Sequence, residues 1–384
     1  MLIGLSFLGF ISLGLPDGLL GVAWPSMRQS FGTPLDALGA LLLTTAAGYL
    51  LSSLSSGWVL DRLGVGGLLA LSGFLTAVGL LGYAIAPAWW LMVWLGLLAG
   101  MGAGAIDAGL NTYAAIHHSP RFLNWLHASY GLGAAGGPAI MMAVLGAGQP
   151  WRLGYLIVGL LQALLGTCFL LTSPRWRMPE PAVRPLPDSP EPAADLVSTL
   201  RLPLVWLSVA LFLVYTGIEA SAGQWSYTLF TEGRSAAPQV AGLWVSIYWG
   251  SLAGGRVLFG FLANRVDPVW LLRAAMLGVL SGSALVWLNP SETLAFLGLG
   301  LMGLASAPIF PSLISTTPQR LGPERAGVVV GFQVGAASLG IALLPGLAGL
   351  LAERLSLEII PPSLVLASLL MLALHEALAG RSSG

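Results

Sequence analysis

Long uncharged stretches of apolar residues dominate the chain, and short polar or proline-containing segments separate them. About 20 consecutive apolar residues form a helix long enough to cross the hydrocarbon core of a bilayer. Twelve stretches reach that length, so the pattern predicts an all-α membrane protein with twelve transmembrane helices. The predicted helices lie approximately at 2–26, 37–60, 66–86, 88–114, 122–147, 151–173, 202–230, 237–262, 268–288, 293–316, 325–350 and 355–379.

The composition also indicates an integral membrane protein, because 56% of the residues are hydrophobic and only 8% are charged. Soluble domains carry about 25% charged residues. The net charge is zero, which suggests no nucleic-acid partner and leaves the bilayer as the main surrounding. The first apolar stretch lacks a basic start and runs through Asp17 without a small-residue cleavage site, so we expect it to remain as a helix.

The arginines are distributed unevenly between the predicted loops, and the chain contains no lysine. If the N-terminus is cytoplasmic, eleven arginines lie on the cytoplasmic side and four on the external side. That asymmetry predicts a multi-pass protein of a bacterial-type cytoplasmic (inner) membrane with both termini in the cytoplasm. The cytoplasmic set is Arg62, Arg121, Arg175, Arg177, Arg184, Arg201, Arg265, Arg273, Arg320, Arg325 and Arg381, and the external set is Arg28, Arg152, Arg234 and Arg354.

One hydrophilic segment, 173–201, divides the predicted helices into six plus six. It holds seven prolines from Pro174 to Pro192, a composition typical of an extended linker. The two halves also resemble one another, since GWVLDRLG at 57–64 follows the second helix and GFLANRVD at 260–267 follows the eighth. In both copies we expect a glycine for close helix approach and then a polar turn. Such a repeat indicates two pseudo-symmetric bundles around a central cavity. The predicted units are 1–173, a linker at 174–201, and 202–384.

Three carboxylic acids and one arginine fall inside the predicted helices, where a charge is costly unless it is solvated, paired or protonated. Asp17, Asp107, Glu219 and Arg256 are therefore candidate ion-coupling residues, and Arg256 is expected to face either one of the three acids or a substrate oxygen. The sequence does not choose between these three partners. Pro16 removes a helix hydrogen bond beside Asp17 and leaves a backbone oxygen that could face an ion or water.

Amide and aromatic side chains accompany these acids at helical spacing. Asp107 and Asn111 are four residues apart and share a helix face, as Asn124 and His127 do at a spacing of three. Amides hydrogen-bond hydroxyl groups, and Trp and Tyr offer flat apolar faces. This mixture suits a sugar or another small polyol. The candidate substrate-binding residues are Asn111, Asn124, His127, Gln224, Trp225, Tyr248, Trp249 and Gln333.

Simpler interpretations exist for several of these features. Glycines in membrane helices often serve only close packing, and most tryptophans anchor helices at the interface. His127 fits an ordinary role at the end of a helix as well as a substrate contact. Pro16 fits a simple kink as well as an ion site. Asp107 and Glu219 are the hardest to explain structurally, because an acid at lipid depth has no packing value.

Five segments carry a resemblance to a known family. The turn at 57–64 resembles the loop signature of the major facilitator superfamily, and 260–267 resembles its weaker second copy. GMGAGAIDAGLNTYAA at 100–115 and LNWLHASYGLGAAGGP at 123–138 are similar to helices 4 and 5 of the fucose-permease-like branch of sugar and cation symporters. APIFPSLIS at 307–315 is similar to helix 10 of that branch.

This resemblance implies cation-coupled uptake of a neutral sugar by alternating access. It also assigns a gating role to the two loop signatures, with Gly57, Asp61, Arg62, Asn264 and Arg265. The coupling ion is expected to be H⁺ or Na⁺, because a carboxylate in low dielectric can bind a proton and because oxygens around Asp17 could start a sodium site. Proton-coupled efflux is the alternative, although Gly96 stands where drug antiporters of the superfamily carry an arginine.

Other functional classes find little support. GLGAAG at 131–136 matches a dinucleotide-binding string, but it lies inside an apolar stretch with no preceding strand. His375-Glu376 does not continue to a second histidine, and no GxSxG occurs. We therefore expect no enzyme and no cofactor, with a membrane sensor or a membrane-embedded enzyme as minor alternatives. The expected partners are a small-molecule substrate and the bilayer, with no nucleic acid, and a monomer is favoured.

Overall fold

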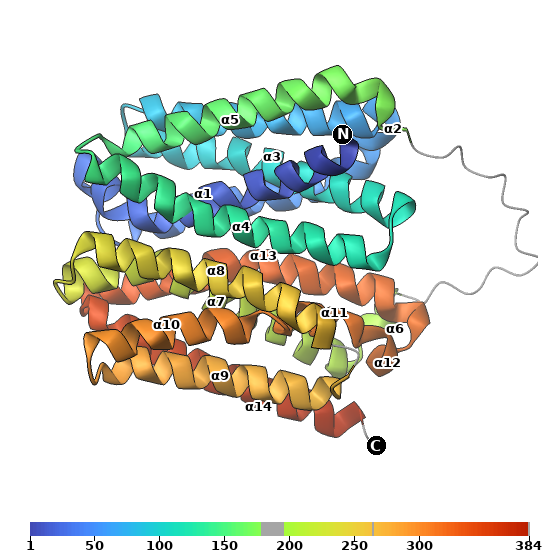
Figure 1. The fold of residues 1–384 in the computed structure, drawn as a ribbon. Coiled ribbons are helices and arrows are strands. Elements are labelled where there is room, and N and C mark those ends of the chain that lie inside the picture. The colour runs from blue at the N-terminus through green and yellow to red at the C-terminus, as the bar shows by residue number, and fades with distance from the viewer. Residues whose placement is uncertain (178–195, 263–264, 383–384) are drawn as a thin grey trace, which may run out of the picture.

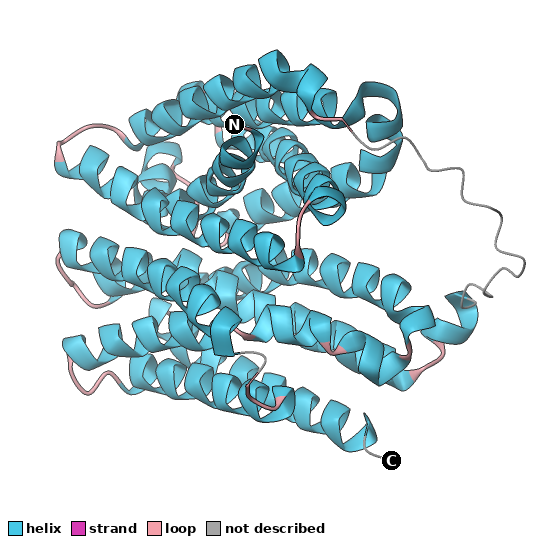
Figure 2. Ribbon diagram, turned by 45° about the vertical axis from the view of Figure 1, so that its right-hand side comes forward, coloured by secondary structure: helices cyan, strands magenta, loops and turns pink. Residues whose placement is uncertain are grey.

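The computed structural model describes residues 1–177, 196–262 and 265–382. The side chains of Pro120, Arg121, Asn124, Leu262, Pro323, Arg381 and Ser382 are also outside the described set, as is the greater part of the predicted linker. Within the described ranges the chain is helical and contains no strand (Figure 2). Ten of its helices are long and apolar enough to cross a membrane, so the predicted all-α membrane fold is confirmed.

In the described ranges the first half of the chain forms five long helices, and the second half forms six helices of at least 15 residues with several short ones. The first set is α1 Leu2–Phe31, α2 Ala37–Ile85, α3 Trp89–His117, α4 Pro120–Gly146 and α5 Trp151–Thr172, followed by the turn η1 Ser173–Arg175. The second set is α6 Leu196–Leu200, α7 Pro203–Thr228, η2 Leu229–Gly233, α8 Pro238–Leu262, α9 Pro268–Leu288, α10 Glu292–Ser306, α11 Ile309–Ser315, α12 Thr317–Leu321, α13 Pro323–Arg354, η3 Leu357–Ile359 and α14 Ile360–Ser382.

Helix α2 contains two of the predicted spans, 37–60 and 66–86, and the predicted turn between them is present as a sharp kink at Gly64 in place of a longer loop. The chain is helical on both sides of Gly64, which alone adopts φ 67° and ψ 176°. That backbone conformation is essentially restricted to glycine. Arg152 donates to the carbonyl oxygen of Ala84, and Trp151 donates to Ser30 Oγ, so both ends of α2 lie at the same end of the molecule. The chain therefore reverses at Gly64 within a single residue.

Prolines act differently in different helices. Helix α1 runs without interruption through Pro16 and Pro25. The predicted helix at 293–316 is instead divided into α10 and α11, and Pro308 stands directly before α11. Because proline has no N–H and clashes with the preceding turn, it ends a helix wherever packing does not compensate. The chain is therefore interrupted at Pro308, whereas a break at Pro16 is not present.

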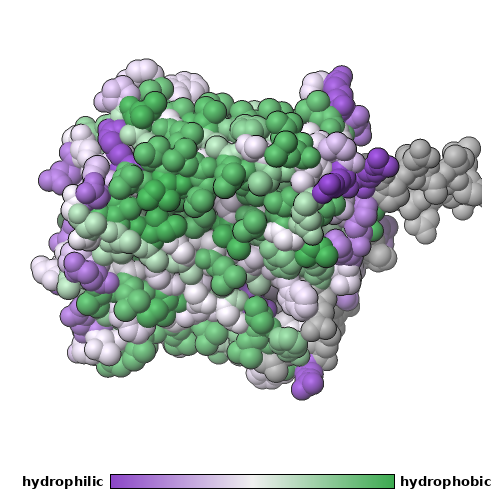
Figure 3. Space-filling model, turned by 45° about the horizontal axis from the view of Figure 1, so that its top comes forward, coloured by the Kyte–Doolittle hydropathy of each residue, from purple (hydrophilic) through white to green (hydrophobic). Residues whose placement is uncertain are grey.

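The helices assemble into two stacked bundles, with α1–α5 in one and α7–α14 in the other (Figure 1). Both chain termini lie at the same end, which we call the termini end, and the turns that follow α1, α4 and α9 lie at the opposite end, the far end. Polar side chains collect at these two ends, and apolar side chains form a belt between them (Figure 3). This distribution matches a protein whose middle lies in hydrocarbon.

The two bundles touch mainly through three helix pairs, α1 with α7, α2 with α13, and α4 with α8, and to a smaller extent through α1 with α8. At the far end, a Cβ atom added to Gly21 would lie 2.6 Å from the carbonyl oxygen of Gly223, and one added to Gly39 would lie 3.1 Å from Gly346 Cα. We call these close glycine contacts the glycine seam. Small residues allow helix backbones to approach this closely.

Towards the termini end α2 and α13 separate, whereas α4 and α8 stay in contact, since an added Cβ atom at Gly131 would lie 2.6 Å from Ala253 Cβ. Added Cβ atoms at Gly57 of α2 and at Gly327 and Gly331 of α13 would have no neighbour within 4 Å. The expectation that Gly57 provides a close helix contact is therefore wrong in this conformation. The equivalent glycine of the second copy, Gly260, is equally open. Between α2 and α13 the structure is thus closed at the far end and open at the termini end.

Candidate binding site between the two bundles

Asp17 lies halfway along α1 and faces the other helices of both bundles. Its Oδ2 accepts a 2.6 Å hydrogen bond from the hydroxyl of Tyr130 on α4, and its backbone oxygen accepts a 3.1 Å bond from Nε2 of Gln224 on α7. The Asp17 side chain is nevertheless exposed. A side chain that is surrounded by helices and still reached by solvent indicates a wet space between the bundles, as an acid at this depth requires.

Asp107 forms a second polar group within the first bundle. Asn111 Nδ2 donates to Asp107 Oδ1 at 3.0 Å, so the predicted shared helix face is confirmed. The hydroxyl of Tyr49 on α2 donates to Asp107 Oδ2 at 2.6 Å. All three side chains are half-buried. They offer a solute one carboxyl group, one amide and one phenol in a single patch.

Glu219 and Arg256 form the third group, which resolves the choice of partner that the sequence left open. Arg256 Nη2 lies 3.7 Å from Glu219 Oε1, and Arg256 Nη1 donates to the backbone oxygen of His127 on α4 at 3.4 Å. Tyr215 donates to Glu219 Oε2 from one helical turn earlier. Both members of the ion pair are about 15% exposed. Arg256 therefore joins the two bundles near the wet space.

A common feature of these groups escaped the sequence analysis: each acid accepts a hydrogen bond from a tyrosine hydroxyl. The tyrosine–carboxyl pairs are Tyr130 with Asp17, Tyr49 with Asp107, and Tyr215 with Glu219. Only the last pair could have been found from the sequence, because its residues are four apart and share a helix face. The other two pairs depend on which helices become neighbours.

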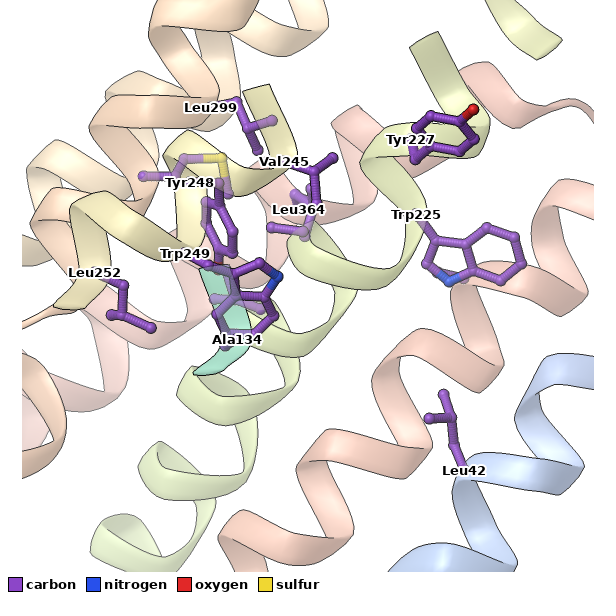
Figure 4. Packing of buried hydrophobic residues seen from close by; sticks show 14 of the residues in the cluster. Leu42, Ala134, Trp225, Tyr227, Val245, Tyr248, Trp249, Leu252, Leu299 and Leu364 are labelled. Carbon is purple, nitrogen blue, oxygen red and sulfur yellow. The ribbon is translucent and has the colours of Figure 1, made fainter. Parts of the chain in front are cut away.

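The aromatic residues divide between two locations (Figure 4). Tyr248 and Trp249 lie together, with Trp249 beside Ala134 of α4. The hydroxyl of Tyr248 donates to the backbone oxygen of Glu219 at 2.8 Å, and the indole N–H of Trp249 is buried without a partner. Trp225 points away from this pair, and its indole donates to the Pro345 carbonyl at 2.9 Å.

Among the other predicted substrate contacts, Gln333 lies apart from the three carboxyl groups. It is fully buried in the second bundle, where it bonds Ser208 and Thr317. His127 is half-buried, and its ring meets that of Phe10 edge-on at 5.1 Å. Asn124 lies outside the described side chains.

The predicted gating residues lie at the termini end. Asp61 and Arg62 are exposed, and the Arg62 guanidinium stacks on the Trp58 ring at 3.5 Å. Arg265 is exposed as well, and Asn264 lies outside the described residues. In this conformation the first loop signature therefore contacts its own helix and stands clear of the second bundle.

No group of three or more His, Cys, Asp or Glu side chains suited to a metal occurs among the described residues. This finding does not bear on a sodium site, because hydroxyl and carbonyl oxygens also bind that ion. The prediction that Asp17 contributes to such a site stays a prediction.

Comparison with known proteins places this architecture in a family. The sequence model of the Major Facilitator Superfamily matches residues 6–345 and, in an overlapping match, 226–378. Among curated proteins, Bypass of stop codon protein 6 of Saccharomyces cerevisiae is 24% identical, with 92% of this chain and 77% of that protein aligned. Glucose/mannose transporter GlcP of Bacillus subtilis is 22% identical over 88% of this chain and 85% of its own length.

Sodium-dependent glucose transporter 1 of Danio rerio is 25% identical over 89% of this chain, which spans 63% of that longer protein. Three solved structures share the fold. A point mutant of the nucleoside transporter NupG has a TM-score of 0.80 at 14% identity, covering 97% of this chain and 98% of its own. A D-xylose-proton symporter has a TM-score of 0.75 at 15% identity, covering 96% of both chains.

FucP in its outward conformation has a TM-score of 0.63 at 15% identity and covers 98% of both chains. The expected likeness to the fucose-permease-like branch is thus confirmed for the fold. The matched family and its structural neighbours are transporters, so the expectation that the chain is not an enzyme is also confirmed. The chain belongs to the Major Facilitator Superfamily and is a multi-pass membrane transporter with the all-α fold of that family.

Proposed function

We propose that this transporter takes up a neutral sugar together with H⁺ or Na⁺ by alternating access. The observation that carries the proposal is the set of three tyrosine–carboxyl pairs at mid-helix depth, all on helices that face the wet space. Carboxyl groups in that position can bind a proton or a cation, and they also accept hydrogen bonds from sugar hydroxyls.

The substrate class follows from the balance of groups around this space. Arg256 is its single described cation, and Glu219 already neutralises it. An anionic solute would favour more than one free arginine. Asn111 and the tyrosine–carboxyl pairs provide hydrogen-bonding groups for hydroxyls, while Trp249 is buried in this conformation and would offer an apolar face to a ring only after the helices move. The printed names of three relatives, a glucose/mannose transporter, a sodium-dependent glucose transporter and a D-xylose-proton symporter, favour the same class.

The orientation in the membrane follows from the arginine distribution, which favours a cytoplasmic termini end. The described conformation would then be open to the cytoplasm and closed outside. Asp17 is the preferred coupling residue, because its carboxyl group is exposed to the wet space and carries no counter-charge, whereas Glu219 is already paired. Binding of a cation at Asp17 would remove an uncompensated charge and favour the sugar-loaded protein.

Transport by purified protein in proteoliposomes tests this proposal. We expect glucose, mannose or xylose to accumulate when a proton or sodium gradient is imposed, and not when the gradient is collapsed. A nucleoside is included in the panel because NupG shares the fold. Uptake of the nucleoside alone would replace the sugar proposal. Outward transport of lipophilic cations would replace it as well.

A matched pair of variants then tests the coupling role. Asp17→Asn should abolish accumulation against a gradient while preserving sugar exchange, because the amide cannot release a proton or balance a cation. Asp36→Asn is the control, since Asp36 is at the far-end start of α2 and its side chain makes no helix-capping bond. Full accumulation by Asp17→Asn would contradict the coupling role.

A further inference from the structure

A small cavity of about 280 Å³ lies at the termini end of the second bundle, apart from the site between the bundles. It is formed where the start of α7 meets α12 and the start of α13, close to α6 (Figure 1). Its walls are apolar at Leu202, Leu204 and Leu321, and cationic at Arg320 and Arg325. These five residues define the arginine pocket.

Arg320 is half-buried, and one nitrogen of its guanidinium is buried without a partner among the described residues. Its Nη2 atom has no hydrogen-bond partner, and Arg320 forms no ion pair among the described residues. Arg320 lies in the short connection between two membrane-spanning segments, Glu292–Ser315 and Glu324–Arg354, and burial lowers the pKa of its guanidinium. A buried cation without a counter-ion is costly, so this position favours binding of an anion.

Arg325 adds a second unfilled donor to the same pocket. Its Nε atom is buried and has no partner, while its Nη1 atom lies 3.2 Å from the carboxylate of the adjacent Glu324. That pair is exposed on both sides, at 36% and 47%, so it satisfies little of the arginine's binding capacity. The pocket therefore offers free guanidinium N–H groups from two arginines, while the exposed Glu324 carboxylate lies at its rim beside Gly322.

We propose that the arginine pocket binds the phosphate group of an anionic phospholipid. Guanidinium groups match phosphate oxygens in geometry as well as charge. Basic pockets between helices at a membrane surface are typical sites for acidic lipid headgroups. The leucine walls continue into a buried cluster of Val205, Leu321 and Val329, so a lipid can place its glycerol and first methylene groups against apolar surface. Free inorganic phosphate has the same charge chemistry but would leave these walls exposed.

The test compares lipids in detergent-purified full-length protein. Phosphatidylglycerol should be retained in native mass spectrometry and should raise the melting temperature, whereas phosphatidylcholine and inorganic phosphate should do neither. Arg320→Gln and Arg325→Gln should each weaken phosphatidylglycerol retention about fivefold, equal to about 1 kcal/mol per arginine at a membrane surface. Arg320→Lys keeps the charge with fewer donors and should retain an intermediate amount.

Two exposed arginines provide matched controls. Arg201→Gln removes a charge beside the pocket, and Arg354→Gln removes one at the far end, so both should keep wild-type retention. Equal retention by the double variant Arg320→Gln, Arg325→Gln and by wild type would overturn the proposal. So would equal stabilisation by millimolar inorganic phosphate, which would assign the pocket to a free anion. Because retention is counted per folded molecule, reduced stability of a variant does not obscure the result.

Discussion

Replacing Glu219 by glutamine removes the counter-charge of Arg256 without changing the shape of the side chain. At the observed 3.7 Å separation, two unit charges attract by about 4.5 kcal/mol at an effective dielectric constant of about 20. The exposure of both side chains, 15% and 14%, allows water to replace part of that attraction. Arg256 also keeps its bond to the His127 oxygen, and the new amide can still accept from Tyr215. We therefore expect a loss of about 2–3 kcal/mol, below the 3–5 kcal/mol of a fully buried pair.

A double-mutant cycle in mixed detergent micelles measures this quantity. Glu219→Gln and Arg256→Gln should each destabilise the protein, while the double variant should recover at least about 1 kcal/mol of their summed loss, because no unpaired charge remains. The control is the pair of Arg273 and Glu376, which is shorter at 2.6 Å but exposed at 33% and 44%. An exposed pair contributes about 0–1 kcal/mol. Additive effects at Glu219 and Arg256, or a larger coupling in the exposed pair, would refute the reasoning.

The remaining predictions concern the helices that carry the site. Gly64→Ala should lower the free energy of unfolding by about 1–3 kcal/mol through its backbone conformation alone, because open space surrounds the position. The control, Gly57→Ala, should be neutral or slightly stabilising. Equal effects of the two variants in unfolding experiments would count against this explanation. Gly21→Ala should slow transport by keeping the far end open, since its Cβ would lie 2.6 Å from the Gly223 oxygen, and unchanged turnover in proteoliposomes would disprove it. Cysteine at Asn111 should react with a water-soluble thiol reagent from the termini end and be protected by substrate, so labelling by lipid-soluble reagents alone would argue against the wet space.

Much of the fold could be predicted from hydropathy, because each membrane helix must satisfy its own backbone hydrogen bonds. The predicted range 151–173 matches α5 to within one residue, and 268–288 matches α9 at both ends. The turn between 37–60 and 66–86 was predicted from the polar residues of GWVLDRLG, but its tightness was not, since only the structure shows that the chain reverses at the single residue Gly64. The interruption before α11 was visible because Pro308 carries its own structural rule.

The candidate site was less accessible to sequence reasoning. The three acids and Arg256 could be selected because a charge at lipid depth stands out against an apolar background. Their neighbours could not be, because Tyr49 and Tyr130 reach Asp107 and Asp17 from other helices. The sequence also did not show which buried amides face the site. Gln224 donates to the Asp17 backbone oxygen, whereas Gln333 bonds within its own bundle.

The glycine seam affects the free energy needed to separate the two bundles at the far end. Backbones that meet through glycine bury little side-chain surface, so their separation sacrifices little hydrophobic energy. Beyond the seam, the described bonds across this end include the Arg28–Glu232 pair, 30% and 32% exposed, and the bond from the Leu35 N–H to Glu353. Bonds of this kind contribute about 1 kcal/mol each. Moving one charge through a potential of 100 mV supplies about 2.3 kcal/mol. Under the proposed ion coupling, one transferred charge would therefore supply about as much energy as these bonds at the far end contribute, and the ion gradient would set the direction of the cycle.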